Sequence, residues 1–136
     1  MATLVKNRTS VPDCKSENKD LLSDRISENA DIEEIQGNLE RFRLKIAGSA
    51  DLLIKEIKRA TSFPIEDISR ILANSPDCKY LRVYHGFNSN NEFVTYLAPI
   101  KDNFDTYIKD SPDTSIISVC CCQCNPCTLD VLLNPE

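Results

Sequence analysis

The apolar residues change their spacing part-way along the chain, and this change limits the folds that are open to the sequence. From residue 32 to about residue 74 they recur every three or four positions, which is typical of helices with one buried face. From Lys79 to Gly86 they alternate with polar residues, which is typical of a strand, and residues 92–98 predict a second strand. We therefore predict an α+β fold, with helices packed on one face of a small antiparallel sheet.

About three helices are expected before the sheet. The first starts after Asp31, which can cap it with Glu34 in a capping-box position, and it ends near Gly48. Its apolar stripe is Ile32, Ile35, Leu39, Phe42 and Ile46. The second is expected over residues 49–60 and the third over residues 64–74, where proline suits the first turn. The expected buried residues of the third helix are Ile65, Ile68, Ile71 and Leu72.

The sheet is expected to hold a hairpin and one further strand. Residues 79–86 and 92–98 flank an asparagine-rich loop, and the β-branched run 116–119 predicts the third strand. Residues 1–30 are polar and predict a flexible arm, with a short helix over residues 20–28. The expected organisation is therefore an arm (1–30), an α+β domain (31–119) and a cysteine-rich C-terminal segment (120–136).

Five of the seven cysteines lie between Cys120 and Cys127. Cys121-x-x-Cys124 and Cys124-x-x-Cys127 each have the spacing that brings two thiolates to one tetrahedral zinc ion. A structural zinc ion takes four ligands, so Cys121, Cys124 and Cys127 need a partner from Cys78, Cys14 or His85. Our predicted metal ligands are Cys78, Cys121, Cys124 and Cys127.

Other roles for the cysteines stay open. Cys124 and Cys127 follow a strand and precede an apolar run, so they form a second candidate, a thiol-redox pair. Only nine residues follow Cys127, which is too few to complete a thioredoxin sheet. S-acylation lacks a polybasic flank, and free cysteines are often simply buried. His85 is the only histidine, and no catalytic constellation or glycine-rich phosphate loop is visible around it.

The charge distribution bears on the partners. The net charge is −5, and residues 61–136 hold 5 basic and 10 acidic side chains, which argues against nucleic-acid binding. No stretch has the length and apolarity of a signal peptide or a membrane span, so we expect a cytoplasmic protein. Thiols stay reduced in that compartment, which favours metal binding over stable disulfides.

One part of the chain resembles a group of small uncharacterised bacterial proteins. The resemblance covers about residues 64–127 and is carried by Pro76, Cys78, the run Leu81-Arg82-Val83-Tyr84, Gly86 and the tail Cys124-Asn-Pro-Cys127. Those proteins pair helices with a Leu-Arg-Ile/Val-Tyr-x-Gly strand and end in a Cys-Pro-rich C-x-x-C tail, to which this chain adds Cys120, Cys121 and Cys122. The resemblance implies that Cys78 and the tail share one site, and it implies no activity.

From these observations we expect an interaction or structural domain, more readily than an enzyme, with a thiolate zinc site in its C-terminal segment. A protein partner or a second copy of the chain is expected on the helical stripe or the hairpin. The alternatives are a thiol-redox protein that uses Cys124 and Cys127, or an oligomer-forming protein whose thiols are incidental.

Overall fold

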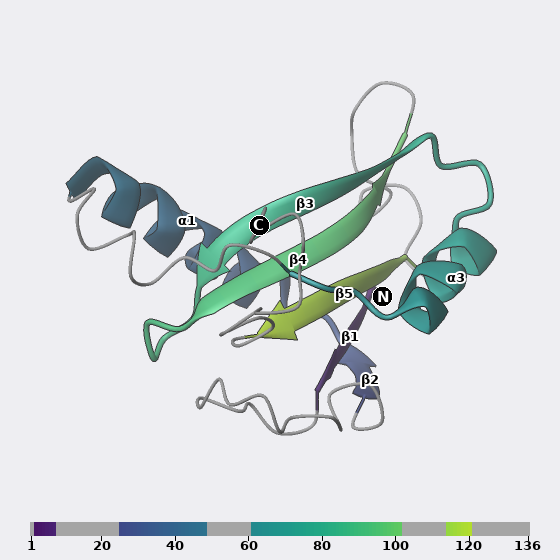
Figure 1. Cartoon of the computed structure of the whole chain (residues 1–136), viewed down its shortest axis with the longest axis horizontal. Helices are drawn as coiled ribbons and strands as arrows, with labels where there is room; N and C mark the ends of the chain where they lie inside the picture. Colours follow the sequence, from purple (N-terminus) through teal and green to yellow (C-terminus); the bar gives the residue numbers. More distant parts are fainter. Residues whose placement is uncertain (1, 8–24, 49–60, 102–113, 121–136) are drawn as a thin grey trace, which may run out of the picture.

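The computed structural model describes residues 2–7, 25–48, 61–101 and 114–120 of the chain. Five strands form one mixed sheet with two helices packed against it, which confirms the predicted α+β class (Figure 1). The elements, in chain order, are β1 (Thr3–Asn7), β2 (Arg25–Asn29), α1 (Ile32–Gly48), α3 (Ile65–Asn74), β3 (Tyr80–Phe87), β4 (Phe93–Ile100) and β5 (Ser115–Cys120).

The strands lie in the order β2-β1-β5-β4-β3. β5 is antiparallel to β4 and parallel to β1, so the last strand in the sequence is the central strand of the sheet. Both faces of β5 are buried: Ile116 packs toward α1, whereas the neighbouring Ile117 packs toward α3. The predicted third strand is thus confirmed, but the sheet is mixed and larger than the predicted antiparallel one.

The two additional strands come from the region that the sequence predicted to be an arm. Residues 3–7 form β1 and residues 25–29 form β2, where the end of a short helix was expected. The local composition of residues 1–30 does not predict these strands, because β1 is stabilised by parallel pairing with β5, more than 100 residues away. This pairing buries Val5 completely. Residues 8–24, which make up most of the predicted arm, lie outside the described residues.

The first predicted helix is confirmed as α1. The Asp31 carboxylate accepts a hydrogen bond from the Glu34 backbone N–H (3.1 Å), as the predicted cap requires. Four residues of the predicted stripe pack against the sheet, but Ile46 is 49% exposed. The last turns of α1 project beyond the strands, which agrees with the half-exposed side chain of Ile46 (Figure 1).

The third predicted helix is confirmed as α3, but its predicted buried face is only half right. Ile71 is fully buried and Ile68 is partly buried, whereas Ile65 is 74% exposed and Leu72 is 50% exposed. The helix meets the sheet along a narrow stripe, and part of that stripe is taken by a buried carboxylate. Asp67 is 2.7 Å from the Arg25 guanidinium of β2. The predicted second helix, residues 49–60, lies outside the described residues.

The predicted hairpin is confirmed, with Tyr84 opposite Tyr96 and Gly86 opposite Val94. Its loop is held by the Asn88 side chain, which accepts hydrogen bonds from the backbone N–H groups of Asn90 and Glu92 (both 2.9 Å). Asn91 adopts φ = 60°, a left-handed conformation that asparagine tolerates better than most residues.

α1 crosses the sheet from β1 to β3. Just before the helix, the Ala30 N–H donates to the Ala2 carbonyl (2.8 Å), which extends the β1–β2 pairing up to the start of α1. Its middle lies directly on Gly86 of β3, where a Cβ would come 2.9 Å from the carbonyl oxygen of Asn38. A real Cβ does not approach a backbone oxygen so closely, so the helix depends on glycine at this position.

Two glycine substitutions test this packing. Gly86→Ala is expected to lower the free energy of unfolding by about 1–3 kcal/mol, because the helix backbone must move away from β3. Gly37→Ala on α1 itself has no neighbour within 4 Å of the added Cβ and is expected to raise the free energy of unfolding by about 0.5–1 kcal/mol. Urea unfolding of both variants measures the difference, and equal stabilities would contradict the close approach.

Candidate functional site

The structure describes one of the four predicted metal ligands. Cys78 lies between α3 and β3 as a half-buried free thiol, and its backbone N–H donates to the Ser75 carbonyl (3.1 Å). Cys121, Cys124 and Cys127 lie outside the described residues. Within the described ranges, no three histidine, cysteine or acidic side chains are grouped as metal ligands would be. The four-cysteine site therefore stays a prediction.

The register of the sheet bears on the fourth ligand of such a site. Cys120 pairs with Val94 at one end of β4, whereas Tyr80, two residues after Cys78, pairs with Ile100 at the other end. Six residues of strand separate these ends, a distance of about 20 Å. Cys78 therefore lies near the end of the sheet opposite to Cys120.

His85 lies at the Val94 end of the sheet, in an aromatic cluster. Its exposed ring is 5.5 Å from the Phe42 ring of α1 and 5.9 Å from the Phe93 ring of β4, measured between centroids. His85 therefore contacts aromatic rings from both α1 and β4 near the end of β3.

A different feature, the outer edge of β3, leaves backbone groups unpaired. The Asn88 N–H donates to the Glu92 carbonyl (3.0 Å), and this bond sets the alternation along the hairpin. Even-numbered residues of β3 direct their backbone groups toward β4, and odd-numbered residues direct theirs outward. No described strand lies beyond β3, so the N–H and C=O groups of Leu81 and Val83 have no strand partner in the described part of the chain.

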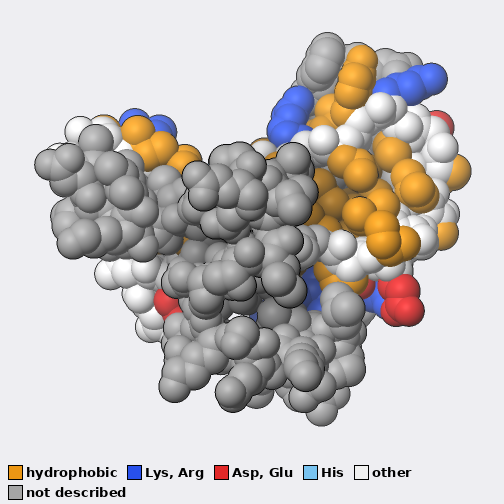
Figure 2. All heavy atoms as spheres, in the orientation of Figure 1, with side chains coloured by type: hydrophobic (Ala, Val, Ile, Leu, Met, Phe, Trp, Pro, Cys, Tyr) orange, Lys and Arg blue, Asp and Glu red, His pale blue; other side chains and the backbone are white. Residues whose placement is uncertain are grey.

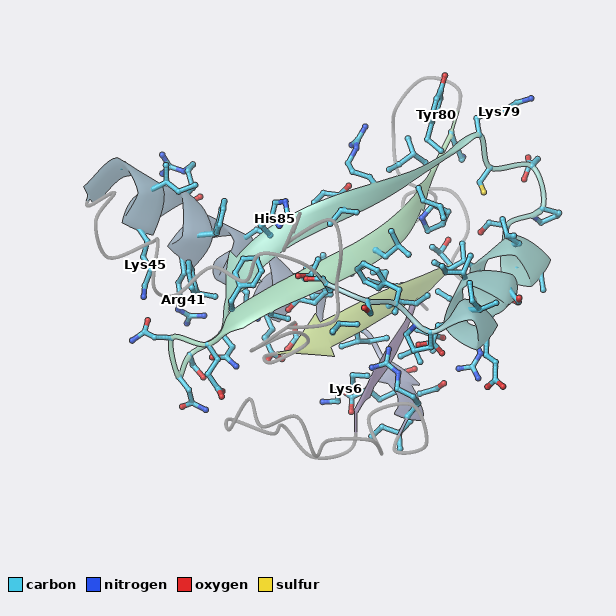
Figure 3. The ribbon with its side chains drawn as sticks, viewed as in Figure 1. Lys6, Arg41, Lys45, Lys79, Tyr80 and His85 are labelled. Atoms are coloured by element: carbon cyan, nitrogen blue, oxygen red, sulfur yellow. The ribbon has the colours of Figure 1, made fainter. Side chains whose placement is uncertain are left out.

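α1 covers only one half of this edge. Near the hairpin loop, Arg41 of α1 donates to the outward carbonyl of Phe87 (3.4 Å), and Phe42 packs against His85. The other half, residues 80–84, is here called the open edge. Figure 3 shows Tyr80 pointing away from the sheet at that end, far from Arg41 and His85.

The side chains of the open edge are partly apolar. Leu81 is 39% exposed, Val83 is 45% exposed and Tyr80 is 52% exposed. Figure 2 shows hydrophobic side chains beside Lys or Arg side chains in the upper right of the view, where Figure 1 places the start of β3 and α3. Unpaired strand groups together with exposed apolar side chains are the features by which a strand edge binds another strand.

A polar pocket of about 320 Å³ opens on the face of the sheet that α1 crosses. It lies where the start of α1 and the hairpin loop meet the strands, and it is lined mainly by carboxylates, amides and hydroxyls. The lining residues are Leu4, Lys6, Glu28, Asp31, Glu34, Ile35, Asn38, Asn88, Ser89, Asn90, Val94, Tyr96 and Ser118.

Two residues that line the polar pocket, Asn38 and Tyr96, belong to a chain of hydrogen bonds. Arg41 donates to the Asn38 side-chain oxygen (2.6 Å), and the Asn38 amide donates to the Tyr96 hydroxyl (2.9 Å). Burial raises the pKa of Tyr96, the Asn38 hydrogen bond opposes that rise, and the charge of Glu34 adds to it. The Glu34 carboxylate and the Tyr96 hydroxyl therefore belong to one electrostatic environment.

Sequence reasoning missed this pocket. Its residues come from β1, β2, α1, the hairpin loop, β4 and β5. These residues are far apart in the sequence and form no recognisable sequence motif. Only the mixed sheet order brings them together. The asparagine-rich loop was noticed in the sequence, but only as a turn.

Comparison of the sequence with protein-family models, with curated proteins and with solved structures found no match. Among the described residues, no helix has the length and apolarity needed to cross a membrane.

The raised pKa of Tyr96 predicts a late step in the titration of the four tyrosines. The folded protein favours the neutral phenol of Tyr96 more than the unfolded chain does. The stability that this preference provides is fully present below about pH 10, and it is lost as the pH rises through the raised pKa. Tyr96→Phe is expected to remove the late phenolate absorbance step and to weaken the loss of stability at alkaline pH. Tyr80→Phe, at an exposed position, serves as the control; if it removed the late step instead, the assignment to Tyr96 would be wrong.

Proposed function

We propose that this chain is an interaction domain that binds an extended segment of another polypeptide at the open edge of β3. The observation that carries the proposal is the row of outward backbone groups on Leu81 and Val83, at the end of the sheet where no described strand follows. Strand addition at such an edge derives its affinity from main-chain hydrogen bonds and its selectivity from alternate side chains.

The partner segment is defined by what the open edge offers. It adds as a sixth strand, exchanging hydrogen bonds with Leu81 and Val83. Alternate side chains of the segment lie beside those of Leu81 and Val83 on the face opposite α1, and apolar groups there bury the exposed aliphatic surface. α1 occupies the edge near Phe87, so it limits how far the added strand extends.

The C-terminal cysteines supply the second part of the proposal, a structural zinc site in a reducing, cytoplasmic setting. We propose Cys121, Cys124 and Cys127 as ligands on the basis of their C-x-x-C spacing. Cys78 is the proposed fourth ligand, and His85, which lies near the end of the sheet where Cys120 pairs with Val94, is the alternative. The site then stabilises the segment that follows the central strand.

Val83→Pro tests the open edge. The Val83 N–H points outward, so proline removes it without breaking the β3–β4 ladder. We would select peptides from a random phage-displayed library on the unmodified protein and measure their affinity for both forms. We expect Val83→Pro to weaken binding at least tenfold, because one backbone hydrogen bond is lost and the ring obstructs the added strand.

The matched control is Val83→Thr, which keeps the N–H group and the branched side chain and is expected to bind the peptides within about twofold of the unmodified protein. Hydrogen exchange gives a second measurement: bound peptide should protect the amides of Leu81 and Val83 and leave that of Arg82, which faces β4, unchanged. Selected peptides that bind Val83→Pro as tightly as the unmodified protein would refute the proposed function. If Val83→Pro fails to fold, Val83→Lys replaces it as a charged block on the edge.

Elemental analysis tests the zinc site. Protein purified under reducing conditions without added metal is expected to contain one zinc ion per chain and to lose it in Cys124→Ser. Cys78→Ser is expected to lose the ion as well, and an ion kept in Cys78→Ser but lost in His85→Ala would assign the fourth position to His85. A metal-free protein whose seven thiols all react freely would eliminate the zinc site, and a reversible Cys124–Cys127 disulfide would favour the redox alternative.

A further inference from the structure

The described residues that line the polar pocket carry more negative than positive charge. They include three carboxylates, Glu28, Asp31 and Glu34, and one cation, Lys6, whose ammonium is 2.7 Å from the Glu28 carboxylate. Within the described residues, neither Asp31 nor Glu34 forms an ion pair. Two carboxylates at the mouth of the pocket are thus left without a counter-charge from the described chain.

The N-terminal end of α1 points at this pocket, and a helix N-terminus ordinarily favours an anion. Here the chain supplies the anions itself. The Asp31 carboxylate already accepts from the Glu34 N–H, and Glu33 and Glu34 stand in the first turn. A second anion would meet these carboxylates, so the charge of the pocket favours a cation.

The floor of the polar pocket offers hydroxyl groups that are not fully used. Ser118 is only 6% exposed and lines the pocket, yet its hydroxyl forms no hydrogen bond with another described residue. Tyr96 is 4% exposed, and its hydroxyl accepts from Asn38, which leaves the phenolic hydrogen available to an acceptor in the pocket. A hydroxyl that opens into a pocket can be satisfied by water or by the polar groups of a ligand.

From these two observations we infer that the polar pocket binds a small polyhydroxylated primary amine, a compound of the amino-sugar class. The ammonium group lies between the carboxylates of Asp31 and Glu34, and hydroxyl oxygens of the ligand accept hydrogen bonds from Tyr96 and Ser118. The cavity of about 320 Å³ is at the lower end of the range for small-molecule sites, which suits a single sugar ring. This site is separate from the open edge of β3, so it adds a ligand to the proposed interaction domain.

Titration calorimetry with glucosamine tests the inference on the full chain. N-acetylglucosamine is the matched probe, because it keeps the ring and hydroxyl groups and lacks the positive charge. We expect glucosamine to bind with a Kd on the order of 1 mM, and N-acetylglucosamine to bind at least tenfold more weakly. No binding of glucosamine at tens of millimolar, or equal binding of both sugars, would overturn the inference.

Two substitutions assign the binding to the pocket. Glu34→Gln removes one of the unpaired carboxylates at an exposed position, and it is expected to weaken glucosamine binding about threefold to tenfold. Ser118→Ala removes a floor hydroxyl and is expected to weaken it about fivefold. Glu33→Gln is the control, since Glu33 stands next to Glu34 on α1 but does not line the pocket. An equal loss in Glu33→Gln and Glu34→Gln would indicate general surface attraction and refute a specific site.

Discussion

The pairing of β5 between β1 and β4 is the interaction on which the rest of the structure depends. β5 is parallel to β1 and antiparallel to β4, so it joins the start of the chain to the hairpin. Bringing such distant segments together costs loop-closure entropy, which is offset by burial of the strand on both faces. Ile116 and Ile117 point to opposite faces of the sheet. Each belongs to a different hydrophobic cluster, Ile116 to the one under α1 and Ile117 to the one under α3.

The same sheet order creates both candidate sites. With β5 in the centre, the hairpin strand β3 becomes an outer strand, and its odd-numbered residues face outward. The β1–β2 ribbon extends the other side of the sheet and contributes Leu4, Lys6 and Glu28 to the polar pocket. An antiparallel three-strand sheet without β1 and β2 would lack this side of the pocket lining. The open edge and the pocket are therefore two consequences of one topology.

The direction of α1 divides the sheet between these sites. The helix starts beside β1, crosses the sheet and reaches β3 at Gly86, where the missing side chain permits contact with the Asn38 backbone. Its first turn supplies the carboxylates of the pocket, and its later turns cover the hairpin end of β3 through Arg41 and Phe42. On the opposite face, the buried pair of Arg25 and Asp67 ties α3 to β2. Loss of one member leaves a buried charge without its partner, which ordinarily costs several kcal/mol.

The sequence by itself determined the elements whose signals are local. The Asp31 cap and the stripe from Ile32 to Phe42 specify a helix through neighbouring residues alone. The alternation of β3 and the asparagine-rich loop after it specify a hairpin in the same way. Tertiary structure decided what depends on distant partners. β1 and β2 are strands because β5 pairs with β1, and Ile65 and Leu72 stay exposed because α3 meets the sheet along a narrow stripe that includes Asp67. The open edge and the polar pocket belong to this second group, because each is a property of sheet order, which no single segment encodes.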